Sequence, residues 1–139
     1  MLLAAGLLLA AAIGAGMLLA RPPAAFDRLL PAAFGEPAQG WVQPVPPGAA
    51  GDRPLTDGQL AAVLELLRQP AYGEADAGAA MQGCYARLYL ADGQGRRVEL
   101  LLRADGLLLN PLDFPGGGRA YRADLGALAS YLRALPTGG

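Results

Sequence analysis

The feature that most constrains the fold is a period-two alternation of apolar and polar side chains in residues 85–90 and 97–103. Successive side chains of a β-strand point to opposite faces of a sheet, so the pattern predicts two strands that share one buried face. The apolar set is Ala86, Leu88, Leu90, Val98, Leu100 and Leu102. The set predicted to lie on the outer face is Tyr85, Arg87, Tyr89, Arg97, Glu99 and Arg103.

Turn residues join these strands into a hairpin. Residues 92–95 read Asp-Gly-Gln-Gly, a composition typical of tight turns. If Leu88 pairs with Leu100, the loop must hold an odd number of residues, so we expect three or five residues or a bulge. The same register places Tyr89 opposite Glu99.

A second hairpin follows at Asp105-Gly106, a dipeptide that favours a type I′ turn because both central residues of that turn need positive φ. The leucines of residues 107–109 then continue as a third strand, which Pro111 ends. The three segments predict an antiparallel meander with residues 97–103 in the middle.

Helical periodicity flanks the predicted meander. Thr56 and Gln59 have the spacing of a capping box, and the helix they open is expected to end before Pro70. A second helix is expected from Asp124 until Pro136. The apolar faces consist of Leu60, Val63, Leu64 and Leu67 in the first helix and Leu125, Leu128, Leu132 and Leu135 in the second. Residues 55–136 therefore predict a small α+β domain of order α-β-β-β-α, with the meander packed on two helices, and residues 137–139 a tail.

Residues 1–20 contain no charged side chain and are long enough to span a bilayer as a helix. A cleavable signal segment is the alternative, but the missing basic residues at its start favour an uncleaved transmembrane anchor. Small residues at positions 6, 10 and 14 could also pack one anchor against another and give a homo-oligomer.

Residues 21–54 are rich in proline and predict a semi-rigid spacer, from which Trp41 and Val42 are expected to dock onto the domain.

The membrane orientation has two interpretations. Arg21 and Arg28 follow the apolar run, which by the positive-inside rule leaves the domain in the cytoplasm. A single apolar segment ahead of a small domain is instead typical of an exported protein, and we expect an extracytoplasmic domain.

Composition excludes several classes of chemistry. The chain has no histidine, and all 11 of its basic residues are arginine. Histidine relays, Schiff-base lysines and phosphate-loop lysines are therefore absent, and a single cysteine cannot form a zinc site or an internal disulfide. The net charge of −1 argues against nucleic-acid binding. We expect no catalytic residue, metal or cofactor.

The candidate binding site is the outer face of the predicted sheet, where tyrosine and arginine gather. These residue types are enriched in interface hot spots, and Leu101 would otherwise be exposed. We therefore predict a non-catalytic, membrane-anchored module that binds another envelope protein through this face, with an ordinary solvated face as the alternative. A second alternative is a carboxylate-dependent hydrolase that uses Glu99 and a loop aspartate.

Two further features have a structural and a functional interpretation. The glycines of residues 116–118, followed by Arg119, could cradle an anion, although a flexible connector is the commoner meaning of such a run. Cys84 is expected to be a small packed residue, and in an exported domain it could form an intermolecular disulfide.

Overall fold

The computed structural model describes residues 24–44, 52–76 and 83–135. The predicted anchor of residues 1–20 and the tail of residues 137–139 lie outside these ranges. A search of the described residues found no helix that is both long enough and apolar enough to cross a membrane.

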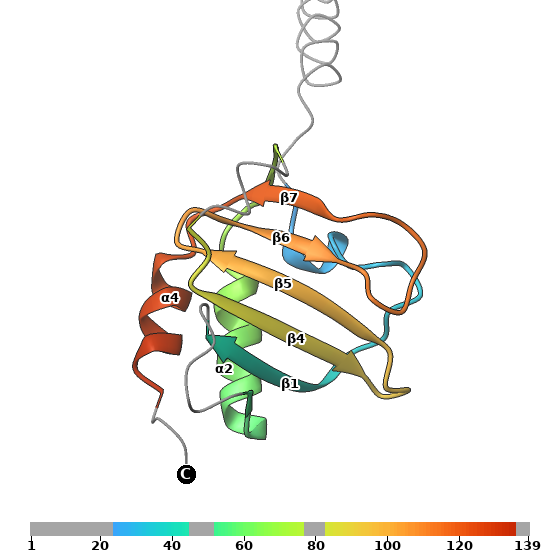
Figure 1. The fold of residues 1–139 in the computed structure, drawn as a ribbon, viewed down its shortest axis with the longest axis horizontal. Helices are drawn as coiled ribbons and strands as arrows, with labels where there is room; N and C mark the ends of the chain where they lie inside the picture. The colour runs from blue at the N-terminus through green and yellow to red at the C-terminus, as the bar shows by residue number, and fades with distance from the viewer. Residues whose placement is uncertain (1–23, 45–51, 77–82, 136–139) are drawn as a thin grey trace, which may run out of the picture.

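The described residues form an α+β domain whose sheet has seven antiparallel strands in the order β2-β1-β4-β5-β6-β7-β3 (Figure 1). The predicted α+β class is confirmed, but the predicted count of three strands was wrong. The elements in chain order are η1 (Phe26–Arg28), β1 (Pro37–Pro44), β2 (Arg53–Pro54), α2 (Asp57–Arg68), β3 (Gly73–Ala75), β4 (Ala86–Asp92), β5 (Arg97–Arg103), β6 (Gly106–Asn110), β7 (Arg119–Arg122) and α4 (Gly126–Arg133).

The predicted meander forms the centre of the sheet as β4, β5 and β6. Leu88 pairs with Leu100 and Tyr89 with Glu99, which confirms the predicted register. Ala91 pairs with Arg97, so the five residues from 92 to 96 form the loop, an odd number as the alternation requires.

The second hairpin forms where predicted, but its predicted turn type was wrong. Arg103 pairs with Gly106, so Ala104 and Asp105 are the two loop residues. Gly106 does not have positive φ, and no non-glycine residue in the described ranges does. Glycine is needed at position 106 for another reason: a Cβ there would collide with the backbone carbonyl oxygen of Tyr121 on β7.

Strands β1 and β2 lie in the stretch that the sequence analysis assigned to a spacer outside the domain. The proline content of residues 21–54 hid β1, which begins at Pro37 and ends at Pro44 but pairs with β4 along its length. Gly40 interrupts the apolar alternation because a Cβ at this position would lie 3.1 Å from Leu60 of α2. The strand therefore uses glycine to approach the helix closely.

Strands β3 and β7 were also missed, because each is too short for a periodic pattern to be recognised. The sequence analysis assigned no strand to either segment. Instead Gly73–Ala75 pairs with β7, and Arg119–Arg122 pairs with β6. Backbone hydrogen bonding to a neighbouring strand, rather than a pattern of side chains, defines both strands.

Both helices cover the same face of the sheet (Figure 1). The capping box of α2 forms as predicted, since Thr56 Oγ1 accepts from the Gln59 N–H and Gln59 Oε1 accepts from the Thr56 N–H. Helix α4 begins after Leu125, where Asp124 Oδ1 accepts from the N–H of Gly126 at 3.1 Å. The apolar residues predicted on the two helix faces are buried in one core with most leucines of β4 to β6, except Leu135, which is partly buried.

Helix α2 also determines the topology, because it connects the two edges of the sheet. β2 and β3 follow each other in the chain but lie at opposite edges. Tyr72, at the far end of this crossing, is almost completely buried and donates from its hydroxyl to the Leu67 carbonyl oxygen at 2.6 Å. This bond satisfies one of the carbonyl groups that the end of a helix leaves unpaired.

Candidate functional site

We use the name outer face for the side of the sheet that is turned away from α2 and α4. Its centre is a row of four side chains, one from each of β1, β4, β5 and β6. The pairings are Trp41 with Tyr89, Tyr89 with Glu99, and Glu99 with Asn110. We call these four residues the central row. Only Tyr89 and Glu99 belong to the site predicted from the sequence.

Trp41 and Tyr89 form an aromatic pair at one end of the central row. Their ring centroids are 5.8 Å apart and their planes differ by 18°, so the rings are stacked. Both residues are partly exposed. The prediction that Trp41 docks onto the domain is confirmed, but its place beside Tyr89 was missed because the two residues become neighbours only through strand pairing.

Glu99 is held by polar neighbours at the other end of the row. Asn110 Nδ2 donates to Glu99 Oε1 at 2.9 Å, and a guanidinium nitrogen of Arg87 lies 4.0 Å from Oε2. The side chain of Glu99 is 13% exposed and that of Arg87 is 45% exposed. Burial, together with the nearby Glu99 carboxylate, raises the pKa of Tyr89, while Arg87 opposes this shift. Among the three predicted arginines, Arg87 has the longest distance to its carboxylate.

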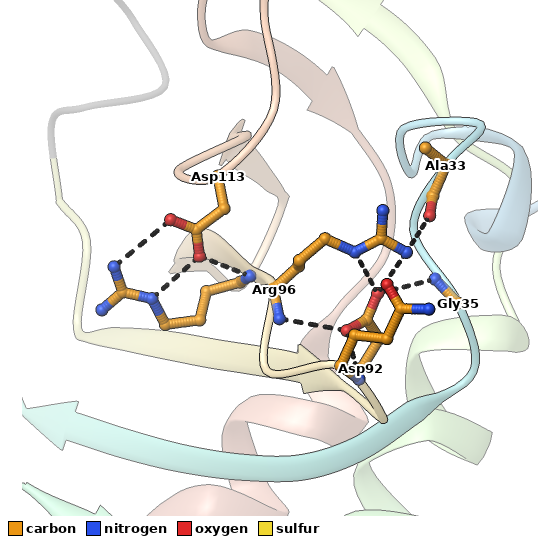
Figure 2. Close-up of polar contacts among 7 residues, drawn as sticks. Ala33, Gly35, Asp92, Arg96 and Asp113 are labelled. Carbon is orange, nitrogen blue, oxygen red and sulfur yellow. Dashed lines mark hydrogen bonds and ion pairs between the residues drawn. The ribbon is translucent and has the colours of Figure 1, made fainter.

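The other two predicted arginines are held by carboxylates in the turns. Arg97 Nε lies 3.0 Å from Asp113 Oδ2, which also accepts from the Arg97 backbone N–H at 2.8 Å (Figure 2). These hydrogen bonds lower the pKa of Asp113, and the same pairing raises that of Arg97. Arg103 Nε donates to Asp105 Oδ1 at 2.9 Å. Both arginines therefore have local partners within the domain.

Tyr85 is not on the outer face, contrary to the prediction. Its ring packs against the main core, with the guanidinium carbon of Arg133 from α4 5.0 Å from the ring centroid. Strand β4 begins at Ala86, which faces the same core. The alternation that holds from Ala86 onward therefore does not extend back to Tyr85, because that residue precedes the regular strand.

Leu101 was predicted to be exposed on the outer face, but it is only 6% exposed. It forms a second apolar cluster with Leu108 and Ala120, and Ala75 and Cys84 pack against this cluster. Cys84 is thus packed among apolar residues, as predicted. Burial raises the pKa of its thiol, although Arg103 and Arg87 oppose the shift, so the reactive thiolate is disfavoured. We call the part around the central row the accessible half of the outer face, because Trp41 and Tyr89 are partly exposed there whereas Leu101 and Leu108 are buried.

The loop carboxylate Asp92 has a structural environment (Figure 2). It is 3% exposed and accepts hydrogen bonds from the backbone N–H groups of Gly35, Gln94 and Arg96, and from Arg96 Nε. The same guanidinium donates to the Ala33 carbonyl oxygen at 2.6 Å. Burial opposes ionisation of Asp92, but these bonds and the Arg96 charge outweigh it and lower its pKa. Asp92 therefore joins the β4–β5 loop to the segment before β1.

This environment bears on the hydrolase alternative. A general acid in glycosidase-type chemistry needs a raised pKa, whereas the pKa values of Asp92 and Asp113 are lowered. The third loop aspartate, Asp105, forms an ion pair with Arg103. Within the described ranges no group of three or more potential metal ligands comes together. No observation among these residues favours carboxylate catalysis over binding.

Comparison with known proteins gave no match to a protein-family model, to a curated protein or to a solved structure.

Proposed function

We propose that this protein is a non-catalytic binding module that recognises another protein through the accessible half of its outer face. The observation that supports this proposal most directly is the partly exposed stack of Trp41 on Tyr89. Aromatic pairs of this kind offer a large contact area with few torsions to restrict on binding, and both residue types are enriched at interface hot spots.

The residues around the stack indicate the chemistry of the partner surface. Arg87 lies in the neighbouring row, is nearly half exposed and contacts Glu99 only at 4.0 Å. It can therefore bind a carboxylate of the partner while an apolar side chain covers the aromatic pair. Arg97 and Arg103 are already bound to Asp113 and Asp105, which gives them a smaller role than the sequence analysis assigned.

The location of the module is a separate part of the proposal. The apolar run of residues 1–20 supports a single-pass membrane anchor, with the domain on the extracytoplasmic side and an envelope protein as partner. Self-association of the anchors through their small residues is a further element of this proposal. These elements rest on the sequence pattern alone.

The test uses cross-linking of the full chain in native membranes, followed by identification of the captured protein. Trp41→Ala and Tyr89→Ala should each lower capture strongly, since hot-spot truncations cost about 2 kcal/mol or more, or roughly 30-fold in affinity. Tyr131→Ala is the matched control, because Tyr131 is a half-buried tyrosine on α4, on the other side of the sheet. Equal capture by all variants would contradict the proposal.

The captured partner can then be titrated in solution. Trp41 is the only tryptophan of the chain, so its fluorescence reports directly on the outer face. Binding at this face should shift the emission of Trp41 when a tryptophan-free segment of the partner is added. Arg87→Gln should weaken binding and reduce its dependence on salt. An unchanged Trp41 spectrum at saturation would place the partner elsewhere on the protein.

A further inference from the structure

A pocket of about 310 Å³ lies between η1 and the segment that connects β6 to β7. Arg119 alternates with Ala120 of the outer-face cluster and pairs with Leu109 of the main core, so it points to the side opposite the outer face. The pocket is therefore separate from the central row. Figure 1 shows η1, in blue, behind the sheet near β6.

Two arginines from distant parts of the chain line this pocket. Arg28 belongs to η1 and Arg119 begins β7, and no carboxylate is among the lining residues. In the described part of the chain neither arginine forms an ion pair, whereas Arg68, Arg96 and Arg97 each bind an aspartate. Two like charges that line one pocket repel each other, and a bound anion would offset this repulsion.

The pocket also presents backbone donors. Gly116 and Gly117 line it, and their N–H groups form no hydrogen bond with any described residue. Gly116 has φ of +116°, a conformation that side chains disfavour, and a Cβ on either glycine would meet open space. The backbone of this loop is therefore accessible, and consecutive free N–H groups are a common means of anion binding.

We propose that this pocket binds a phosphate group carried by a larger molecule. A guanidinium presents paired donors that match phosphate oxygens. Two guanidiniums and two loop glycines that line the same pocket together offer a tetrahedral oxyanion several donors. A carboxylate has only two oxygens in one plane and would satisfy fewer of these donors. Leu29 and Leu30 also line the pocket and provide apolar surface for the remainder of the ligand.

The phosphate could come from a soluble ester or from a lipid head group, and the experiment has one arm for each source. The full chain, isotope-labelled in detergent micelles, is titrated with glycerol 3-phosphate in one arm and with phosphatidic acid in the other. Diacylglycerol, which lacks the phosphate, is the control for the lipid arm. The readout is the chemical shift of the Gly116 and Gly117 amides.

Saturable shifts of these amides with either phosphate probe, and none with diacylglycerol, are expected. The responding arm then identifies the source. The double variant Arg28→Gln/Arg119→Gln should bind at least tenfold more weakly. The matched double variant Arg122→Gln/Arg133→Gln removes the same charge outside the pocket and should bind like the wild type. Absence of shifts with both probes in the wild type, or equal weakening in the two double variants, would overturn the proposal.

Discussion

Replacement of Tyr85 by phenylalanine should stabilise this protein, although it removes a polar group from a packed side chain. The hydroxyl oxygen of Tyr85 is buried and has no hydrogen-bond partner among the residues that the structure describes. The ring packs against the main core and beneath the guanidinium of Arg133, and phenylalanine retains both contacts. The substitution therefore removes the desolvated hydroxyl and little else.

The magnitude follows from the cost of leaving a buried polar group unpaired, which is about 1–3 kcal/mol. We expect Tyr85→Phe to raise the free energy of unfolding by about 1–2 kcal/mol, because loss of one oxygen atom also removes a little dispersion energy. For a domain of this size, each kcal/mol corresponds to roughly 4–8 °C in melting temperature. Both effects are well above the error of a denaturation experiment.

Alkaline pH gives a second, independent readout. Burial raises the pKa of Tyr85 from 10.0 to about 12, with Arg133 opposing the shift and Cys84 adding to it. Because the pKa of Tyr85 is higher in the folded than in the unfolded protein, the folded state holds the phenolic proton more tightly. The resulting stability is fully present below pH 10 and is lost as the pH rises toward 12. The advantage of the Tyr85→Phe variant should therefore increase between pH 10 and pH 12.

The assay is urea denaturation followed by far-ultraviolet circular dichroism, in which the midpoint should rise with an unchanged slope. Tyr131→Phe is the matched control, because Tyr131 is half-buried on α4 and its hydroxyl is not among the buried, unpaired polar groups of the described residues. The stability change of this variant should stay within about 0.5 kcal/mol. A loss of stability in Tyr85→Phe would show that the hydroxyl has a partner and would refute the reasoning.

Three further predictions concern the fold. Gly106→Ala should destabilise the domain by about 1–3 kcal/mol in urea denaturation through a backbone collision, whereas Gly93→Ala, where a Cβ meets open space, should change little. Tyr72→Phe should cost about 1–2 kcal/mol in the same assay, because the Leu67 carbonyl loses its partner; a stabilised variant would contradict this role. Acid should destabilise the domain as Asp92 is protonated. The pKa of Asp92 is lower in the folded than in the unfolded protein, so the associated stability is present above pH 3.8, the ordinary value, and is lost as the pH falls below 3.8. An Asp92→Asn variant should show a weaker loss of stability on acidification, and an identical acid profile would argue against this group.

The regular centre of the fold was predictable from local patterns. The alternation around Leu88 and Leu100 determined the register of β4 and β5, since a shift by one residue would exchange the buried and outer faces. Thr56 and Gln59 identified the start of α2 because a capping box is a contact over three residues. These features depend on neighbours in the sequence, so the sequence reveals them directly.

The remaining strands of the sheet could not be predicted from local sequence patterns. β1 is bounded by Pro37 and Pro44, and Gly40 interrupts its apolar alternation; this glycine suits the close approach of α2 and conceals the strand pattern. The short strands β3 and β7 depend on hydrogen bonds to strands that are distant in the chain. The prediction for Tyr85 was wrong because the alternation was extended one residue beyond the start of the strand.

The candidate site shows the same division. The sequence by itself determined that arginine must supply the positive charge of the site, since histidine and lysine are absent from the chain. Only the tertiary structure placed Trp41 on Tyr89, bound Arg97 and Arg103 to turn carboxylates, and buried Leu101. The physical reason is that residue type limits which interactions a side chain can form, whereas strand order and packing decide which of those interactions are made.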